Sequence, residues 1–254
     1  MARPTIVFVP GSWHGPECFQ PLMDELAGHG FKTTAIALPS NTLDTHAPPA
    51  TLSDDTAEVR KAIEADLEVG NDVCLIAHSY GAVPASNACR SLGRDARAAS
   101  GQKAAVVSFV VMTGPLVFPG ISFAGDFGNK PSPIHNIQYP FTKVGEPGPG
   151  YWFYHDLPAE EAIKWSRRVM TSSWKVCEET ITHAAFLEIP TWYLLTTLDN
   201  AIPLGVQKYF VQRARDKGAL LPESHVVELA SGHCPFLSQI DATSAFIRKA
   251  AGEV

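Results

Sequence analysis

The sequence C-L-I-A-H-S-Y-G-A, residues 74–82, decides the fold of the whole chain. An apolar run that favours a buried strand ends at Ala77, and the small-residue segment 82–92 suits a helix. The small residues Ala77 and Gly81 stand two positions before and after Ser79, so a sharp turn there can expose the serine hydroxyl at the carboxyl end of the strand. The alternative is an ordinary strand-helix turn, because motifs this short also match by chance.

The composition bounds the class of protein. With 254 residues, 45% hydrophobic and 18% charged, the chain suits one large globular domain or one domain with an insertion. The formal charge is -6 and no run of Lys or Arg stands out, so we expect neither nucleic acid nor a membrane as a partner. No apolar run could span a bilayer, and the run at 6–10 is too short for a signal-peptide core.

The cysteine pattern argues against a fold held together by disulfide bonds or by a metal ion. The five cysteines include no C-x-x-C pair, and no His, Cys and carboxylate spacing resembles a metal site. We therefore expect no metal, reduced thiols and a cytoplasmic location. A homodimer is one assembly that the sequence leaves open.

Strands and helices alternate along most of the chain. The expected strands are 5–9, 33–38, 73–77, 104–112, 191–196 and 226–229, and the expected helices are 16–30, 53–69, 82–92, 203–216 and 235–251. Ser53 is the expected cap of its helix. Strands separated by helices predict an α/β fold with a parallel sheet covered on both faces.

Residues 115–189 interrupt this alternation. They are dense in Pro and Gly to about residue 150, rich in aromatic residues, and show helical patterns near 158–170 and 173–187. We expect a lid inserted after the fourth strand, with the core formed by residues 1–114 and 190–254. The alternative is a structural excursion with a small core of its own.

Two residues downstream could activate Ser79. A serine hydroxyl needs a base within hydrogen-bond reach, and the base needs an orienting acid. Asp199 follows the strand 191–196, and His233 follows the strand 226–229. Each alone is an ordinary loop residue, but the carboxyl ends of parallel strands share one edge, so together they predict a Ser79-Asp199-His233 catalytic triad.

Acyl transfer also needs hydrogen-bond donors for the developing oxyanion. The backbone N–H of Tyr80, directly after Ser79, is one candidate. The other is the N–H of Ser12, in the loop that follows the first strand. The Ser12 hydroxyl either contacts substrate or makes a turn hydrogen bond. His14 in the same loop is expected to brace it, and His78 to pack or hydrogen-bond locally.

Four segments together resemble the α/β-hydrolase superfamily: V-F-V-P-G-S-W-H-G (7–15), A-H-S-Y-G-A (77–82), T-T-L-D-N-A-I-P (196–203) and S-G-H-C (231–234). They look most like the branch that holds plant methyl esterases and hydroxynitrile lyases, with bacterial and fungal relatives. The lid stretch 153–162 is similar to one in those relatives. The resemblance implies a mostly parallel sheet of about six strands with helices on both faces, a helical lid, no cofactor and the triad named above.

The chain departs from that branch in places. Pro10 stands where the loop after the first strand usually starts with His. The lyases carry a lysine directly after the catalytic histidine, and Cys234 here counts against cyanohydrin chemistry. Ser79 argues against dehalogenases and epoxide hydrolases, which need an aspartate nucleophile.

These features predict a serine hydrolase that cleaves an ester or lactone of a small apolar, aromatic molecule. A lyase, cyclase or carbon-carbon bond-cleaving enzyme could use the same triad, and a small-molecule receptor could keep the same scaffold. His155, Asp156 and His183 lie in the lid, where one of them could touch substrate. The side chains expected to bind substrate are Trp13, Phe118, Trp152, Tyr154, His183 and Cys234.

Overall fold

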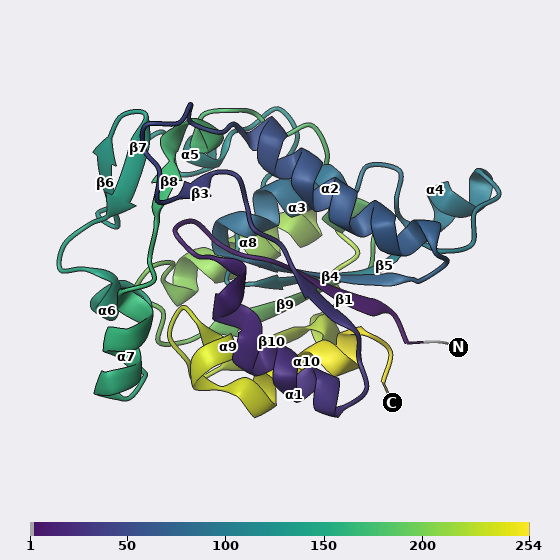
Figure 1. Ribbon diagram of the computed structural model, residues 1–254. Coiled ribbons are helices and arrows are strands. Elements are labelled where there is room, and N and C mark those ends of the chain that lie inside the picture. The colour runs from purple at the N-terminus through teal and green to yellow at the C-terminus, as the bar shows by residue number, and fades with distance from the viewer. Residues whose placement is uncertain (1–2, 254) are drawn as a thin grey trace.

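The computed structural model describes residues 3–253. A six-stranded sheet lies at its centre, and every pair of neighbouring strands in that sheet is parallel (Figure 1). In spatial order the strands are β10 (Val226–Leu229), β9 (Thr191–Thr196), β5 (Val106–Met112), β4 (Val73–His78), β1 (Thr5–Val9) and β2 (Thr33–Ala35). The predicted α/β class and parallel sheet are confirmed.

Helices cover both faces of the sheet because its strands are apolar on both sides. In β1, Ile6 and Phe8 pack on one face, and Val7 and Val9 on the other. The first face is covered by α1 (Gln20–Gly28), α9 (Pro235–Ser238) and α10 (Ile240–Ala250), and the second by α2 (Leu52–Glu68), α3 (Ala82–Ala88) and α8 (Leu204–Asp216) (Figure 1). The short α4 (Arg94–Ala99) precedes β5.

The start of α2 differs from the expectation. Thr51, rather than Ser53, caps the helix. Its side chain accepts a hydrogen bond from the N–H of Asp54, whose carboxylate accepts one from the Thr51 N–H. Thr51 has the extended backbone that a cap needs, whereas Ser53 already lies inside the helix. This reciprocal pair satisfies two backbone donors that the first turn would otherwise leave free.

The segment predicted as a lid is a mixture of strands and short helices. Its strands β6 (His135–Gln138), β7 (Phe141–Val144) and β8 (Thr171–Ser173) form an antiparallel sheet with β3 (Asn41–Thr42), and its helices are α5 (Phe123–Asp126), α6 (Pro149–Trp152) and α7 (Ala159–Ser166). This segment lies beyond the carboxyl ends of the parallel strands (Figure 1). Its boundary at residues 115–189 stays a prediction, and β3 from the first half of the chain joins its sheet.

The helix expected over 173–187 does not form. Residues 171–173 pair as β8 instead, and only two short 3-10 turns follow, at Trp174–Cys177 and Ala185–Leu187. The apolar side chains of this stretch are buried one by one against the central core rather than along one helical face. No helix within residues 3–253 is long and apolar enough to cross a membrane.

Candidate active site

Ser79 stands at a strained turn directly after β4. Its backbone φ is 52°, in the left-handed region that non-glycine residues rarely adopt. The turn presses closely against the loop after β1, because a Cβ added at Gly81 would lie 2.5 Å from the Pro10 carbonyl oxygen. Only glycine fits there, which explains in steric terms why Gly81 follows the serine by two positions.

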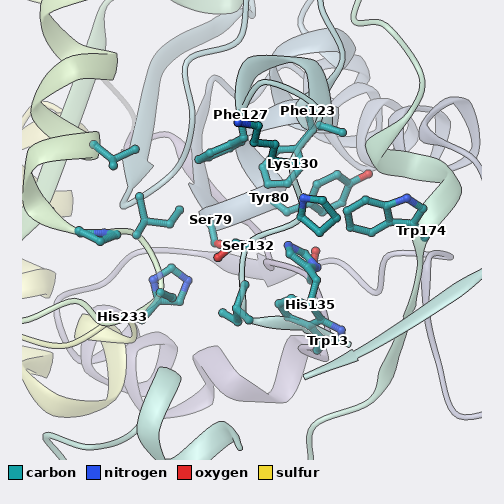
Figure 2. Close-up of a pocket in the computed structure, with 18 of the residues that line it drawn as sticks. Trp13, Ser79, Tyr80, Phe123, Phe127, Lys130, Ser132, His135, Trp174 and His233 are labelled. Atoms are coloured by element: carbon teal, nitrogen blue, oxygen red, sulfur yellow. The ribbon is translucent and has the colours of Figure 1, made fainter. Parts of the chain in front are cut away.

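His233 and Asp199 meet at the same edge of the sheet. The His233 Nδ1 donates a hydrogen bond of 2.8 Å to Asp199 Oδ2, and both side chains are buried. This bond fixes the proton on Nδ1 and leaves Nε2 unprotonated in the neutral ring. Ser79 and His233 line one cavity (Figure 2), so the three residues predicted as a triad come together.

Asp199 is held by a network that sequence reasoning did not find. Its Oδ1 accepts the backbone N–H groups of Ala201 and Ile202, at 2.8 and 2.9 Å. Its Oδ2 accepts from the Thr196 hydroxyl at 3.0 Å and lies 3.3 Å from the amide of Gln207. These hydrogen bonds orient both carboxylate oxygens of Asp199. No sequence motif predicted that Gln207 would contact this carboxylate.

A second histidine, His78, directly precedes Ser79. His78 is fully buried, and its Nε2 donates to the backbone carbonyl of His233 at 2.8 Å. Burial, together with the proximity of His233 and His14, holds the pKa of His78 well below its usual value. His78 is therefore uncharged at neutral pH and supports the loop that carries His233, in agreement with the local role expected for it.

The loop after β1 is braced from two sides. His14 Nδ1 donates to the Ser12 carbonyl at 2.8 Å, so its Nε2 accepts from the Tyr154 hydroxyl, also at 2.8 Å. Burial lowers the pKa of His14 to about 4, which keeps the ring neutral. Asn41 accepts the Trp13 N–H at 2.8 Å and donates to the carbonyls of Gly11 and His14 at 2.9 and 3.0 Å.

This bracing decides which backbone donor of the loop is available. The Trp13 N–H is taken by Asn41, whereas the Ser12 N–H has no acceptor within residues 3–253. Ser12 and Tyr80, the two residues predicted to supply oxyanion donors, both line the cavity. The sequence did not indicate this role of Asn41, because a single asparagine in a polar, proline-containing loop belongs to no motif.

Residues 151–156 contact the loop after β1 and the loops that carry Asp199 and His233. Tyr154 reaches the loop after β1 through His14. Asp156 Oδ2 accepts the Gly232 N–H at 2.6 Å, directly before His233. Asn200, which follows Asp199, donates to the carbonyl of Tyr151 at 2.9 Å. We call this stretch the brace segment.

The cavity has a volume of about 200 Å³ and is partly open to solvent, which leaves room for a small aromatic molecule, since a cavity of ~150 Å³ can hold benzene. Its wall is mainly apolar and aromatic (Figure 2). The aromatic and imidazole groups that line it are Trp13, Tyr80, Phe123, Phe127, His135, Phe153, Trp174 and His233.

Of the six side chains expected to bind substrate, Trp13 lines the cavity and the other five lie outside its wall. The Trp152 indole N–H donates to the Gly145 carbonyl, and Phe118 packs on Phe186. Tyr154 is buried on His14, as above.

Two more of these expectations need correction. His183 is buried beside Glu188, with its Nε2 3.7 Å from that carboxylate. Cys234 does not line the cavity but is buried in the core, with its Sγ 4.0 Å from His14 Nε2, and burial raises the pKa of its thiol well above the usual value. All five cysteines are free and buried, and within residues 3–253 no group of three or more His, Cys, Asp or Glu could hold a metal ion.

A profile of the alpha/beta hydrolase family matches residues 6–246. The chain belongs to the alpha/beta hydrolase family. Over 259 residues it is 30% identical to the alpha/beta hydrolase nvfD of Aspergillus novofumigatus, covering 100% of this chain and 98% of that one. It is 26% identical over 253 residues to the probable hydrolase R7 of a Phoma species, covering 99% and 100%.

Solved structures of alpha/beta hydrolases share the fold. Polyneuridine aldehyde esterase aligns with a TM-score of 0.72 at 18% identity, covering 98% of this chain and 99% of that one. A methylesterase from Arabidopsis aligns with a TM-score of 0.71 at 18% identity, covering 97% and 98%. The predicted resemblance to plant methyl esterases and to fungal relatives is confirmed, and the family supports hydrolase function.

Proposed function

We propose that this alpha/beta hydrolase is a serine hydrolase that cleaves an ester or lactone of a small, apolar, aromatic molecule through an acyl-enzyme. The observation that carries the proposal is the 2.8 Å hydrogen bond from His233 to Asp199 at a cavity that Ser79 also lines. The strained φ of Ser79 adds support, since strain of this kind concentrates at functional sites.

In the proposed reaction, Ser79 Oγ attacks the ester carbonyl while His233 Nε2 takes its proton. The imidazolium that forms is stabilised by the Asp199 carboxylate. His233 then gives the proton to the leaving alcohol, and the acyl group stays on Ser79. Water, deprotonated by His233, attacks the acyl-enzyme, releases the acid and restores the serine.

The tetrahedral oxyanion would be held by the N–H groups of Ser12 and Tyr80. The hydrogen bonds of Asn41 and His14 support this role, because they fix the peptide planes on both sides of Ser12. Such fixed donors need no reorganisation in the transition state, and removing one costs on the order of 10²- to 10³-fold in turnover.

The apolar character of the substrate follows from the wall of the cavity. Phe123, Phe127, Phe153 and Trp174 offer flat apolar surfaces, which favour an aromatic group. Two structural neighbours are named as esterases, in agreement with an ester as the bond that is cleaved.

Product analysis in water that carries a heavy oxygen isotope tests the reaction type. A hydrolase must place one labelled oxygen in the acid product, whereas a lyase or cyclase forms its product without it. Turnover of p-nitrophenyl acetate and of an aryl methyl ester should both give labelled acid. Unlabelled acid, or turnover that persists in Ser79→Ala, would contradict the proposal.

A further inference from the structure

His135 is a polar group in the otherwise aromatic part of the cavity wall. It is the first residue of β6, and its ring lies 4.9 Å from that of Trp13 and 5.0 Å from that of Trp174, measured between centroids. In Figure 2, it is drawn beside these two indoles, with His233 on the other side of Ser79. The catalytic steps proposed above do not use it.

The ring of His135 is neutral and incompletely hydrogen-bonded. Burial lowers its pKa to about 4, so the imidazole carries one proton at neutral pH. Its Nδ1 is buried and has no hydrogen-bond partner within residues 3–253. A buried N–H without an acceptor is rarer in proteins than a buried acceptor without a donor, so the proton belongs on Nε2.

The surroundings select a neutral ligand. The two indoles next to His135 carry no charge that could balance an ion, and neither does Phe153, which packs on Trp13. Among the lining residues of the described chain, Lys130 is the one lysine or arginine. Lys130 is exposed, so an anionic group of a ligand would be stabilised by this charge at the rim of the cavity and not beside His135. A neutral oxygen can instead accept a hydrogen bond from an imidazole N–H without losing much hydration.

We propose that His135 determines specificity by donating a hydrogen bond to a second, neutral oxygen of the substrate. The inference rests on the proposed function and narrows its substrate class to oxygenated aryl esters. The aromatic body would lie among Trp13, Phe153 and Trp174, with its ester carbonyl at Ser79 and a hydroxyl or ketone at His135. Either oxygen serves, because both accept a hydrogen bond.

The test is a set of matched esters. Methyl cinnamates that carry a hydroxyl or an acetyl group at each ring position are compared with isosteres that carry a methyl or an isopropyl group. Each compound is measured as a substrate and as a competitor of p-nitrophenyl acetate. At the preferred ring position, the wild-type enzyme should favour the oxygenated ester on the order of 10- to 100-fold, the usual loss when one hydrogen bond is left unmade.

Two variants assign that preference to His135. His135→Phe keeps a flat ring but has no donor, so the ratio should fall close to one by a loss on the oxygenated esters alone. His135→Gln keeps an N–H donor and should restore part of the ratio. The matched control is Tyr139→Phe, which removes a polar group from the exposed end of the same strand pair and should leave the ratio unchanged.

Different failures have different meanings. No preference for oxygenated esters in the wild type, or an unchanged ratio in His135→Phe, would overturn the inference and leave the hydrolase intact. Comparison of the hydroxyl and acetyl series shows which oxygen is recognised. Absence of p-nitrophenyl acetate turnover and of fluorophosphonate labelling in the wild type would instead contradict the proposed function.

Discussion

Asp156 offers a sharp test of how the brace segment positions His233, the proposed catalytic base. Its Oδ2 accepts the Gly232 N–H at 2.6 Å and lies 3.3 Å from the Ser231 hydroxyl, one and two residues before His233. Asp156 does not line the cavity. We therefore expect it to act on the rate of the chemical step through His233, and not on substrate binding.

The size of the effect follows from the bond that is lost. Asp156→Ala leaves the buried Gly232 N–H without its charged acceptor, which costs about 1.5 to 3 kcal/mol. If this cost appears as misplacement of His233 in the transition state, kcat falls about 10- to 100-fold, since ~1.4 kcal/mol is a factor of ten. KM should change little, and the melting temperature should fall by a few degrees.

Steady-state kinetics with p-nitrophenyl acetate measures this, together with two further variants. Asp156→Asn keeps an acceptor oxygen for the Gly232 N–H and should recover most of the kcat. If Asp156 only stabilised the fold, kcat would not have to follow the presence of this acceptor. Glu160→Ala alters an exposed carboxylate four residues further along the chain, in α7, and should behave like the wild type. The reasoning is refuted if Asp156→Ala keeps kcat within threefold, or if KM changes instead.

Three other variants probe the scaffold of the site. Asn41→Ala removes three hydrogen bonds to the loop after β1 and should lower kcat/KM about 10- to 100-fold in the same assay. The free energy of unfolding should fall by ~1 to 3 kcal/mol. An unchanged kcat/KM would mean that the loop holds its shape without Asn41. Asp55, on α2, accepts hydrogen bonds from the Tyr80 hydroxyl at 2.8 Å and from the Ser40 N–H at 2.9 Å. Burial raises the pKa of Asp55 from 3.8 to about 6, so the folded state holds a proton that the unfolded chain has lost, and the free energy of unfolding falls as the pH rises between these values. Asp55→Asn should remove about 3 kcal/mol of this fall in urea titrations, and an unaltered pH profile would be inconsistent with the raised pKa. The pH dependence that His14 contributes to stability has the opposite sign, because burial lowers the pKa of His14 from 6.5 to about 4. The free energy of unfolding therefore falls as the pH falls through this range, and His14→Gln should reduce that fall.

The central sheet could be predicted because each strand carries its own signal. The runs at 5–9 and 191–196 are apolar on both faces, and the structure keeps their boundaries unchanged. The ends of the strands fix where the loops begin, so the sequence alone predicts that Asp199 and His233 lie at the same edge of the sheet. Parallel sheets convert local patterns into a shared site.

The cavity wall could not be predicted in the same way. Trp152 and Phe153 are neighbours with similar character, yet Phe153 faces the cavity and Trp152 bonds to a backbone carbonyl outside it. Phe153 packs against Trp13 and His14 of the loop after β1, so which of the two points inward depends on a contact between distant segments. Such pairing between distant segments leaves no local pattern.

The supporting residues around the triad were hidden for a related reason. Gln207 lies on α8 and reaches back to Thr196 and Asp199 from a helix face that otherwise reads as core. Only the packing of α8 against β9 brings its amide to the carboxylate.

The central claim is that Ser79 is the nucleophile, and covalent labelling tests it most directly. Wild-type protein treated with an alkyl fluorophosphonate should gain one adduct, which peptide mass spectrometry places on Ser79. Ser79→Ala should gain none while keeping its fold by circular dichroism. Labelling that persists in folded Ser79→Ala, or an adduct on another residue of the wild type, would contradict the account.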